Sequence, residues 1–278
     1  MRGLRRSRPS GPLSKAVLPP EGLSAWANRS GSTPWWLCPG CSGPRRGICR
    51  DNEILYDALA YKLPQRTSAL DRARMQSVAL ATTALGQGAG FVTAGSERLR
   101  SKSLDRNSFN SGDWFNQIGW DCAEGNGFGR GLPPAADNEA KWPYAKPLLA
   151  DPKLVPGCDA VTLADVRYRE LLEIRKPSPV FGLPTAAEVQ KRLSFPLSGA
   201  AETPGVITMQ LDGRGLDRRW KSVTVVFNAT PAAATQTVAA LKGASVGPYP
   251  LQHEAASFDR ATGRFTVPAR TTAVFVQS

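Results

Sequence analysis

The sequence predicts a chain of two structural classes, an α/β part followed by an all-β part. A helix-then-strand pattern between residues 53 and 94 is one unit of a parallel α/β architecture. From residue 181 on, short strand-like runs are separated by turn-rich segments, as in an antiparallel β-sandwich. We therefore expect three parts: a basic, Pro-, Gly- and Ser-rich segment at residues 1–50, an α/β part at residues 51–180 and a β-sandwich at residues 181–278.

Three helices are expected in the α/β part. Apolar residues at helical spacing predict the first over residues 53–62, and a longer pattern predicts the second over residues 68–85. Ser68 is suited to cap the second helix, with Asp71 at its N3 position. The third helix is expected over residues 161–176, because a proline follows directly.

The segment between the second and third helices contains a strand and a long loop. Residues 90–94 form a short apolar run beside glycines and predict a buried strand. Residues 98–156 then show little regular pattern. A loop of that length in a compact domain is functional or disordered. After the strand end of a (β/α) barrel, such a loop would face the active site.

The all-β part is predicted from four strand-like runs. They are rich in Val, Thr and Phe and are separated by segments rich in turn residues. The expected strands lie at residues 205–212, 222–228, 264–269 and 271–277.

Charge and hydropathy argue against two classes of partner. The net charge of the 278 residues is +12, which would suit a nucleic-acid-binding protein. However, residues 1–50 hold nine Lys or Arg and a single acid, Glu21, whereas the remaining residues hold 26 bases and 22 acids. We therefore expect no nucleic-acid partner. We also expect no membrane partner, because no apolar run approaches the roughly 18 residues that span a bilayer.

The five cysteines do not indicate a disulfide framework. Their number is odd, and we interpret the thiols as mostly free in a reducing compartment. A closed zinc site takes four ligands, and the single histidine, His253, lies far along the chain from the CxxC pair. We therefore predict no metal and no cofactor. The cysteines are the CxxC pair Cys38 and Cys41, the third candidate ligand Cys49, and Cys122 and Cys158.

Residues 91–116 combine many polar side chains with a terminal aromatic pair. Planar hydrogen-bonding side chains suit sugar hydroxyls, and an aromatic face suits the C–H patches of a sugar ring. The loop therefore suits a polyhydroxylated ligand. Two alternatives remain: a structural turn plugged by Trp114, and a solvated charge run with internal ion pairs at Arg98, Arg100, Lys102 and Arg106.

A series of long motifs carries a family resemblance over residues 51–278. The motifs are DNEILYDALAYKLP, FVTAGSERLRSKSLDRNSFNSGDWFN, GFGRGLPPAADNEAKWPYAKPLLADP, LLEIRKPSPVF and FTVPARTTAVFVQ, in this order. The sequence resembles pullulanases and plant-type limit dextrinases, the starch-debranching enzymes of the alpha-amylase superfamily (glycoside hydrolase family 13). The resemblance implies the last part of a (β/α)8 TIM barrel, incomplete in this chain, followed by a C-terminal antiparallel β-sandwich domain.

The resemblance also implies a function. The family hydrolyses α-1,6-glucosidic branch links in pullulan, limit dextrin and amylopectin, so the implied partner is a branched α-glucan such as starch. Asp113, Trp114 and Asn116 match the family's Gly-Asp-Trp-Phe-Asn motif and are the implied substrate-binding residues. The plant-type character implies a plastid location, the alternative being a soluble intracellular one. The oligomeric state stays open.

One catalytic carboxylate of the family has a counterpart in this sequence. Retaining hydrolysis needs a nucleophile and an acid/base carboxyl about 5 to 5.5 Å apart, and the family adds a third carboxylate that favours the transition state. Asp51 matches the third group, although Arg50 replaces the preceding His. The other two lie on earlier strands of the family and have no counterpart here, so we expect a catalytically incomplete chain. The alternative for Asp51 is an ordinary helix N-cap.

Several further interpretations stay open. Residues 1–50 suit a plastid transit peptide, a disordered arm, or a truncated or misassembled start, which we favour because residues 43–46 could not form a buried parallel strand. A non-catalytic glycan-binding or regulatory protein is the alternative function, and a nucleic-acid-binding chain is a third. We interpret Trp120 and Trp142 as packing residues and His253 as a surface residue without a partner.

Overall fold

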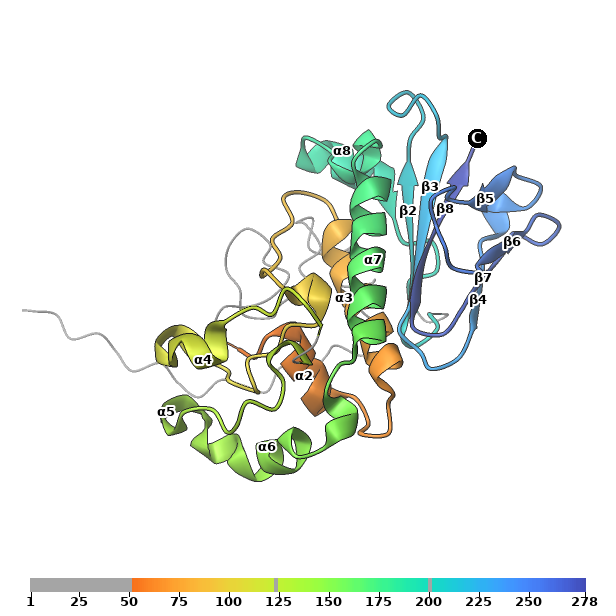
Figure 1. The fold of residues 1–278 in the computed structure, drawn as a ribbon. Coiled ribbons are helices and arrows are strands. Elements are labelled where there is room, and N and C mark those ends of the chain that lie inside the picture. Colours follow the sequence, from red (N-terminus) through yellow and green to blue (C-terminus); the bar gives the residue numbers. More distant parts are fainter. Residues whose placement is uncertain (1–51, 123–124, 200–201) are drawn as a thin grey trace, which may run out of the picture.

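The computed structural model describes residues 52–122, 125–199 and 202–278. A helical part and two antiparallel sheets lie side by side, and the long helix α7 (Cys158–Arg175) stands between them (Figure 1). The described residues thus form a mixed helix and antiparallel-sheet structure. The predictions for Asp51 and for the possible zinc ligands Cys38, Cys41 and Cys49 fall outside the described residues.

The three predicted helices are confirmed, with small shifts at their ends. They are α2 (Leu55–Lys62), α3 (Ala69–Ala84) and α7. Ser68 caps α3 as expected, because its hydroxyl accepts a hydrogen bond from the backbone N–H of Asp71 at 3.1 Å. At the C-terminal end of α3, the guanidinium of Arg175, in the last turn of α7, donates to the carbonyl of Ala84 at 2.7 Å. Arg175 therefore caps the C-terminus of α3.

The long segment without a regular pattern contains a series of short helices. None of those between α3 and α7 exceeds eight residues in the described ranges. In chain order they are η1 (Ser96–Arg98), η2 (Ser108–Asn110), α4 (Gly112–Asn116), η3 (Gly125–Gly127), α5 (Ala135–Asn138), η4 (Glu139–Lys141), α6 (Trp142–Leu149) and η5 (Pro152–Leu154). After α7 follow η6 (Pro179–Phe181), α8 (Ala186–Arg192) and, among the strands, η7 (Ala239–Leu241).

The four predicted strands are confirmed, and all described strand pairs are antiparallel. A five-stranded sheet has the order β1 (Leu193–Ser194), β2 (Val206–Asp212), β3 (Ser222–Asn228), β8 (Thr271–Gln277) and β5 (Val246–Pro248). A three-stranded sheet has the order β4 (Ala234–Thr237), β7 (Arg264–Val267) and β6 (Ser257–Asp259).

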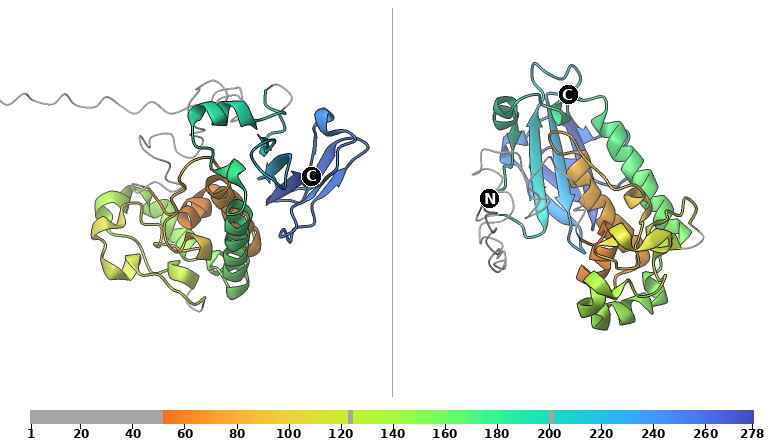
Figure 2. Two further views of the ribbon diagram at one scale, coloured as in Figure 1. Left: turned by 90° about the horizontal axis from the view of Figure 1, so that it is seen from above. Right: turned by 90° about the vertical axis from the view of Figure 1, so that its left-hand side faces the viewer.

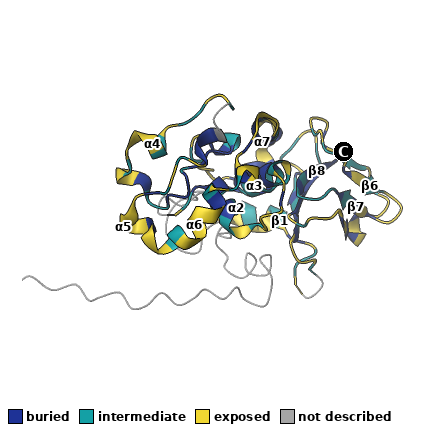
Figure 3. Ribbon diagram, turned by 60° about the horizontal axis from the view of Figure 1, so that its bottom comes forward, coloured by how far each residue is buried: buried dark blue, intermediate teal, exposed yellow. Residues whose placement is uncertain are grey.

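Alternate residues of β3 and β8 face two different cores. Val223, Val225 and Val274 pack with α3 and α7, whereas Val226 and Phe275 pack with the three-stranded sheet. Because successive side chains of a strand point to opposite faces, these central strands are buried on both sides. A further buried cluster lies within the helical part, around Tyr56 of α2 and Val161 of α7, whereas α4, α5 and α6 are largely exposed (Figure 3). Two further views show the five-stranded sheet alongside the helices (Figure 2).

The prediction of a buried strand at residues 90–94 was wrong. Phe91 is half exposed and forms only an isolated bridge, and Ala94 is exposed. A parallel strand is buried when other strands and crossover helices cover it, and the described ranges contain no parallel strand pair. Among the described residues, the apolar run therefore has no parallel strand beside it to bury it.

Candidate functional site

A tight turn at residues 95–104 forms the base of the candidate site. Gly95, Leu99, Ser103 and Leu104 all have left-handed backbone conformations, with φ values of +87°, +57°, +53° and +65°. Such a conformation costs roughly 1–2 kcal/mol for a residue other than glycine. It persists only where the surrounding structure fixes it, and the three non-glycine residues here are fully buried.

The carboxylate of Asp57, on α2, fixes this turn. It accepts hydrogen bonds from the Ser101 hydroxyl, from the backbone N–H of Lys102 at 2.9 Å and from that of Leu104 at 3.1 Å. Burial raises the pKa of Asp57 to about 7, against the opposite influence of these three donors. Sequence reasoning missed Asp57, because one acid in a helical pattern looks like a solvated surface residue.

Two cations of the predicted charge run point into the protein. Arg100 is only 7% exposed, and its Nη1 donates to the carbonyl of Ala94 at 3.1 Å. The ammonium of Lys102 donates to the hydroxyl of Ser108. Burial lowers the pKa of both groups. The alternative of a solvated loop is therefore wrong for Arg100.

The other two cations of the run lie nearer the surface. Arg98 forms an ion pair with Asp165 of α7 at 3.8 Å, and Arg106 donates to the side chain of Asn52 at 3.4 Å. Internal pairing, which the sequence suggested, thus occurs at Arg98.

Asn116, one of the three predicted glycan-contact residues, bonds within the chain. Its Nδ2 donates to the carbonyl of Ser108 at 2.7 Å and to that of Gly112 at 2.9 Å. Its Oδ1 accepts a hydrogen bond from the Ser108 hydroxyl at 2.8 Å. This side chain therefore joins η2 to α4 and fixes the geometry of the site.

Trp114, the second predicted residue, stands on α4 and is held by Arg130. The indole Nε1 donates to the carbonyl of Arg130 at 2.8 Å, and Nη1 of Arg130 donates back to the carbonyl of Trp114 at 2.9 Å. The guanidinium also lies over the indole ring, 5.5 Å from its centroid. The indole is nevertheless 59% exposed. We call the Trp114 side chain with the stacked Arg130 guanidinium the Trp114 platform.

Asp113, the third predicted residue, is exposed on the same helix. Asp113 and Trp114 thus place an exposed carboxylate and an oriented aromatic ring together on α4, whereas Asp51 lies outside the described residues. Trp120 is 66% exposed, which contradicts its interpretation as a packing residue. Trp142 is partly buried and donates to the carbonyl of Pro133 at 3.0 Å, so it does pack.

A disulfide ties the loop after α4 to the start of α7. Cys122 and Cys158 are bonded, with their Cα atoms 4.9 Å apart. The interpretation of the thiols as mostly free was therefore wrong for the two described cysteines. Their separation of 36 residues gave no local signal, because only the fold brings the two chain segments together.

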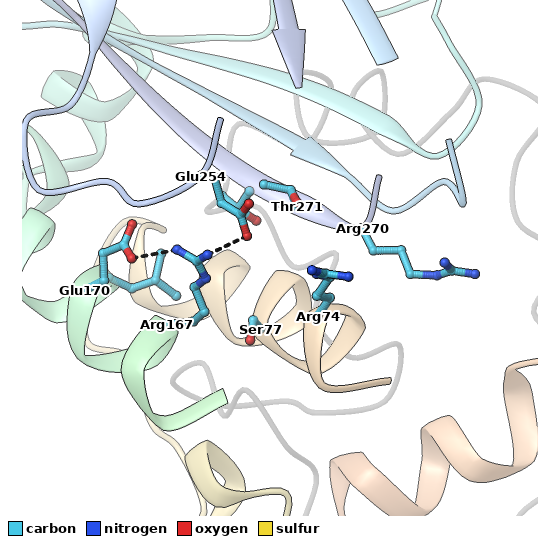
Figure 4. A pocket seen from close by; sticks show the side chains of 9 residues that line it. Arg74, Ser77, Arg167, Glu170, Glu254, Arg270 and Thr271 are labelled. Carbon is cyan, nitrogen blue, oxygen red and sulfur yellow. Dashed lines mark hydrogen bonds and ion pairs between the residues drawn. The ribbon is translucent and has the colours of Figure 1, made fainter. Parts of the chain in front are cut away.

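A small cavity lies between α3, α7 and the end of the sheet (Figure 4). Its volume is about 30 Å³, which suits one or two water molecules. Arg167 spans it, pairing with Glu170 at 3.0 Å and with Glu254 at 2.8 Å. Because Glu254 belongs to the β part and Arg167 to α7, this ion-pair group joins the helical part to the sheets.

The same interface holds a second ion-pair group. Arg270, in the turn before β8, pairs with Asp71 of α3 at 2.8 Å, and Arg74 approaches the same carboxylate at 3.4 Å. Since the three arginines that line the cavity all have carboxylate partners, we interpret it as a joint between the two parts rather than as a ligand site.

His253 is a surface residue, as predicted, but it has a partner. Its Nδ1 lies 3.1 Å from Oε2 of Glu170, and its backbone N–H donates to the same carboxylate at 3.3 Å. The residue therefore belongs to the joint beside the cavity.

Across the described ranges, no helix has the length and the apolar character that crossing a bilayer requires. Within those ranges, no group of three or more His, Cys, Asp or Glu residues is arranged to hold a metal ion.

Comparison with known proteins places the chain in a family. The family described as "Alpha-1,6-glucosidases, pullulanase-type, C-terminal" matches residues 123–278. The chain is 41% identical over 243 residues to "Pullulanase 1, chloroplastic" of Arabidopsis thaliana, covering 82% of this chain and 25% of that protein.

Solved structures agree. The apo pullulanase from Klebsiella pneumoniae matches with a TM-score of 0.77 and 32% identity, covering 84% of this chain and 26% of that chain. A maltotriose complex of PulA from the same organism matches with a TM-score of 0.76 and 32% identity, covering 83% and 26%. The chain spans about a quarter of the length of these relatives. It belongs to the pullulanase-type family of alpha-1,6-glucosidases.

Proposed function

We propose that this chain binds α-glucan chains through the Trp114 platform, as the C-terminal portion of a starch-debranching enzyme. The helical part would be the last part of a (β/α)8 barrel, and the two sheets would be the β-sandwich domain that follows it. The branched glucan would be pullulan, limit dextrin or amylopectin. A plastid location is part of the proposal, and the similarity to a chloroplastic pullulanase supports it.

The observation that carries the proposal is the exposure and fixed orientation of the Trp114 indole. Its N–H is already bonded and its ring is stacked on Arg130, yet 59% of the residue faces solvent. A rigid aromatic face suits the C–H patches of a glucose ring, and ordering costs are small when the face is held in place before binding. The exposed Asp113 carboxylate on the same helix can accept hydrogen bonds from sugar hydroxyls.

Catalysis would need groups that these 278 residues do not supply. Asp51 would stabilise the transition state, and no counterpart of the nucleophile or the acid/base precedes it in this sequence. We therefore propose that this chain contacts glucan without hydrolysing it. The alternative is a non-catalytic glycan-binding or regulatory protein, for which the same exposed Trp114 surface would be the binding site.

Affinity electrophoresis in gels that contain maltodextrin tests the proposal. We expect the native chain to be retarded and Trp114→Ala to migrate without retardation. Tyr144→Ala is the matched control, because Tyr144 on α6 is an aromatic residue with even greater exposure, 70% against 59% for Trp114. Migration of the native chain at the same rate with and without maltodextrin would refute the proposed function.

A further inference from the structure

Helix α4, which carries Trp114, is too short to hold itself in place. It has five residues, and an isolated helix of that length is not stable in water. Its position, and that of the indole, must therefore come from the groups that bond its two ends. These groups are the Asn116 side chain, which ties α4 to Ser108 of η2, and side chains that reach α4 from other segments.

Two arginines bond the carbonyl groups at the end of α4. Nη2 of Arg100 donates to the carbonyl of Asn116, and Nη1 of Arg130 donates to that of Trp114 at 2.9 Å. The last carbonyl groups of a helix have no partner within it. Positive charge at this end is also favourable for the helix dipole. The two guanidinium groups thus complete a helix end that the local sequence leaves open.

Arg100 is the more rigid of the two. It is only 7% exposed, and Nη1 fixes it to the carbonyl of Ala94 at 3.1 Å. Gly95 has left-handed backbone geometry and leaves room for the arginine, because a Cβ there would lie 2.9 Å from Cδ of Arg100. Asp57 holds the rest of the turn through Lys102 and Leu104. The backbone that carries the Arg100 guanidinium is therefore held in place.

Two hydrogen bonds offset part of the cost of burying the Arg100 charge. Nη1 and Nη2 donate to the backbone carbonyl groups of Ala94 and Asn116, whereas Nε is buried and has no hydrogen-bond partner among the described residues. Burial lowers the pKa of its guanidinium, and the nearby charge of Arg130 adds to this effect. Burying a charge is costly, but the planar fork can bond two carbonyl groups at once, which the single ammonium of lysine does less well.

We propose that Arg100 is a positioning residue for the Trp114 platform, although it need not touch the glucan. It ties the end of α4 to the turn that Asp57 fixes, and this sets the orientation in which the indole meets a sugar ring. The inference rests on the proposed function for the contact with glucan. The orientation of the indole itself can be measured without any ligand.

Arg100→Gln tests the proposal, with Arg106→Gln as the matched control. Arg106 lies in the same segment, and its side chain reaches Asn52 rather than α4. A urea titration first shows that each chain is folded. NMR then measures the hydrogen exchange rate of the Trp114 indole N–H, whose signal is assigned by its loss in Trp114→Phe. The second quantity is the Kd for maltotriose. We expect Arg100→Gln to speed the exchange and to raise the Kd about tenfold, because the platform is no longer preorganised.

Two further variants distinguish the expected result from the contrary one. Arg106→Gln should leave the exchange rate and the Kd unchanged. Arg100→Lys should recover part of the affinity for maltotriose, because it keeps the charge and one donor. An exchange rate and Kd in Arg100→Gln equal to those of the native chain would overturn the proposal. If the native chain does not bind maltotriose, the proposed function fails, and the exchange rate still decides whether Arg100 positions the indole. If Arg100→Gln does not fold, the same measurements on Arg100→Lys decide.

Discussion

Asp57 and Leu104 are joined by a hydrogen bond of 3.1 Å that links α2 to a buried left-handed residue 47 positions later in the chain. The same carboxylate oxygen accepts the N–H of Lys102 at 2.9 Å. The Asp57 carboxyl thus helps to hold this strained turn from outside it, together with groups such as Gln76 and Asn126 that bond the carbonyls of Ser96 and Arg98. The ionisation of that carboxylate should consequently appear in the stability of the whole protein.

The first prediction concerns the pH dependence of stability. The pKa of Asp57 is raised from 3.8 to about 7 in the folded protein. Between these values the folded state holds a proton that the unfolded state has lost, so the contribution of Asp57 to the free energy of unfolding falls as pH rises through this window. The total change is on the order of 4 kcal/mol. Below the window this contribution is fully present, and above it the contribution is lost.

Asp57→Asn isolates this contribution. Asparagine can still accept the two backbone N–H groups and cannot ionise. We expect urea unfolding to give free energies of unfolding that diverge between pH 4.5 and pH 8. As pH rises through this range, the variant should become more stable relative to the native chain. Other carboxylates titrate in both proteins, so only the difference between them is informative. Parallel pH profiles would show that the Asp57 pKa is not raised.

The elements that the sequence predicted well have local signals. The N-cap of α3 needs only Ser68 and Asp71, three residues apart, and β3 and β8 show directly in their runs of β-branched and aromatic residues. Asp113 and Trp114 on α4 were singled out through a motif that lies within a few residues, and their contact with glucan stays a prediction. In each case the information that decides the structure is close in the sequence.

The features that the sequence did not predict depend on distant contacts. Asp57 bonds residues 44 to 47 positions away, and Arg100 bonds the carbonyl of Asn116, 16 positions on. A charge run on a loop is usually solvated, and nothing local shows that Arg100 turns inward. Conversely, residues 90–94 have the local pattern of a buried strand but lack parallel neighbours in the described ranges.

The second prediction concerns the disulfide between Cys122 and Cys158. Breaking it should lower the free energy of unfolding by about 4 kcal/mol, which the loop-entropy relation gives for a separation of 36 residues. Urea unfolding with and without a thiol reductant measures the loss. Cys122→Ser with Cys158→Ser in one chain is the control, because it should be as unstable as the reduced protein and insensitive to reductant. An oxidised native chain no more stable than this double variant would contradict the bond.

The third prediction contrasts two arginines at the joint between helices and sheets. The Arg167 side chain is 18% exposed and pairs with Glu170 and Glu254, so Arg167→Ala removes the arginine from one buried and one partly buried carboxylate. We expect a loss of about 3 kcal/mol in the free energy of unfolding. The Arg74 side chain is 41% exposed, so Arg74→Ala should cost less than about 1 kcal/mol. Equal losses in thermal or urea unfolding would show that Arg167 does not hold the joint.

The fourth prediction concerns activity. Incubation of the purified 278-residue chain with pullulan should release no reducing ends above those of a heat-inactivated sample, because a retaining mechanism needs two carboxyl groups that this sequence does not supply before Asp51. A pullulanase of Klebsiella type in the same buffer serves as the positive control. Release of reducing ends by this chain, abolished in Asp51→Asn, would contradict the proposed catalytic incompleteness.

The fifth prediction concerns the contact between residues 127–131, the loop that carries Arg130, and the turn at residues 95–104 that Asp57 bonds. Gly127 has a φ of +96°, and a Cβ there would lie 2.5 Å from the backbone oxygen of Ser101. Gly127→Ala must therefore push the two segments apart, and we expect a loss of about 3 kcal/mol in the free energy of unfolding. Gly131→Ala is the matched control, because Gly131 has a φ of +106° but a Cβ there meets no atom within 4 Å. The control carries the backbone strain without the clash, so the difference between the two losses measures the close approach itself.

Because Arg130 lies in this loop, Gly127→Ala should also weaken glucan retardation more than Gly131→Ala does. Equal losses of stability in the two variants would show that the loop does not press against the turn.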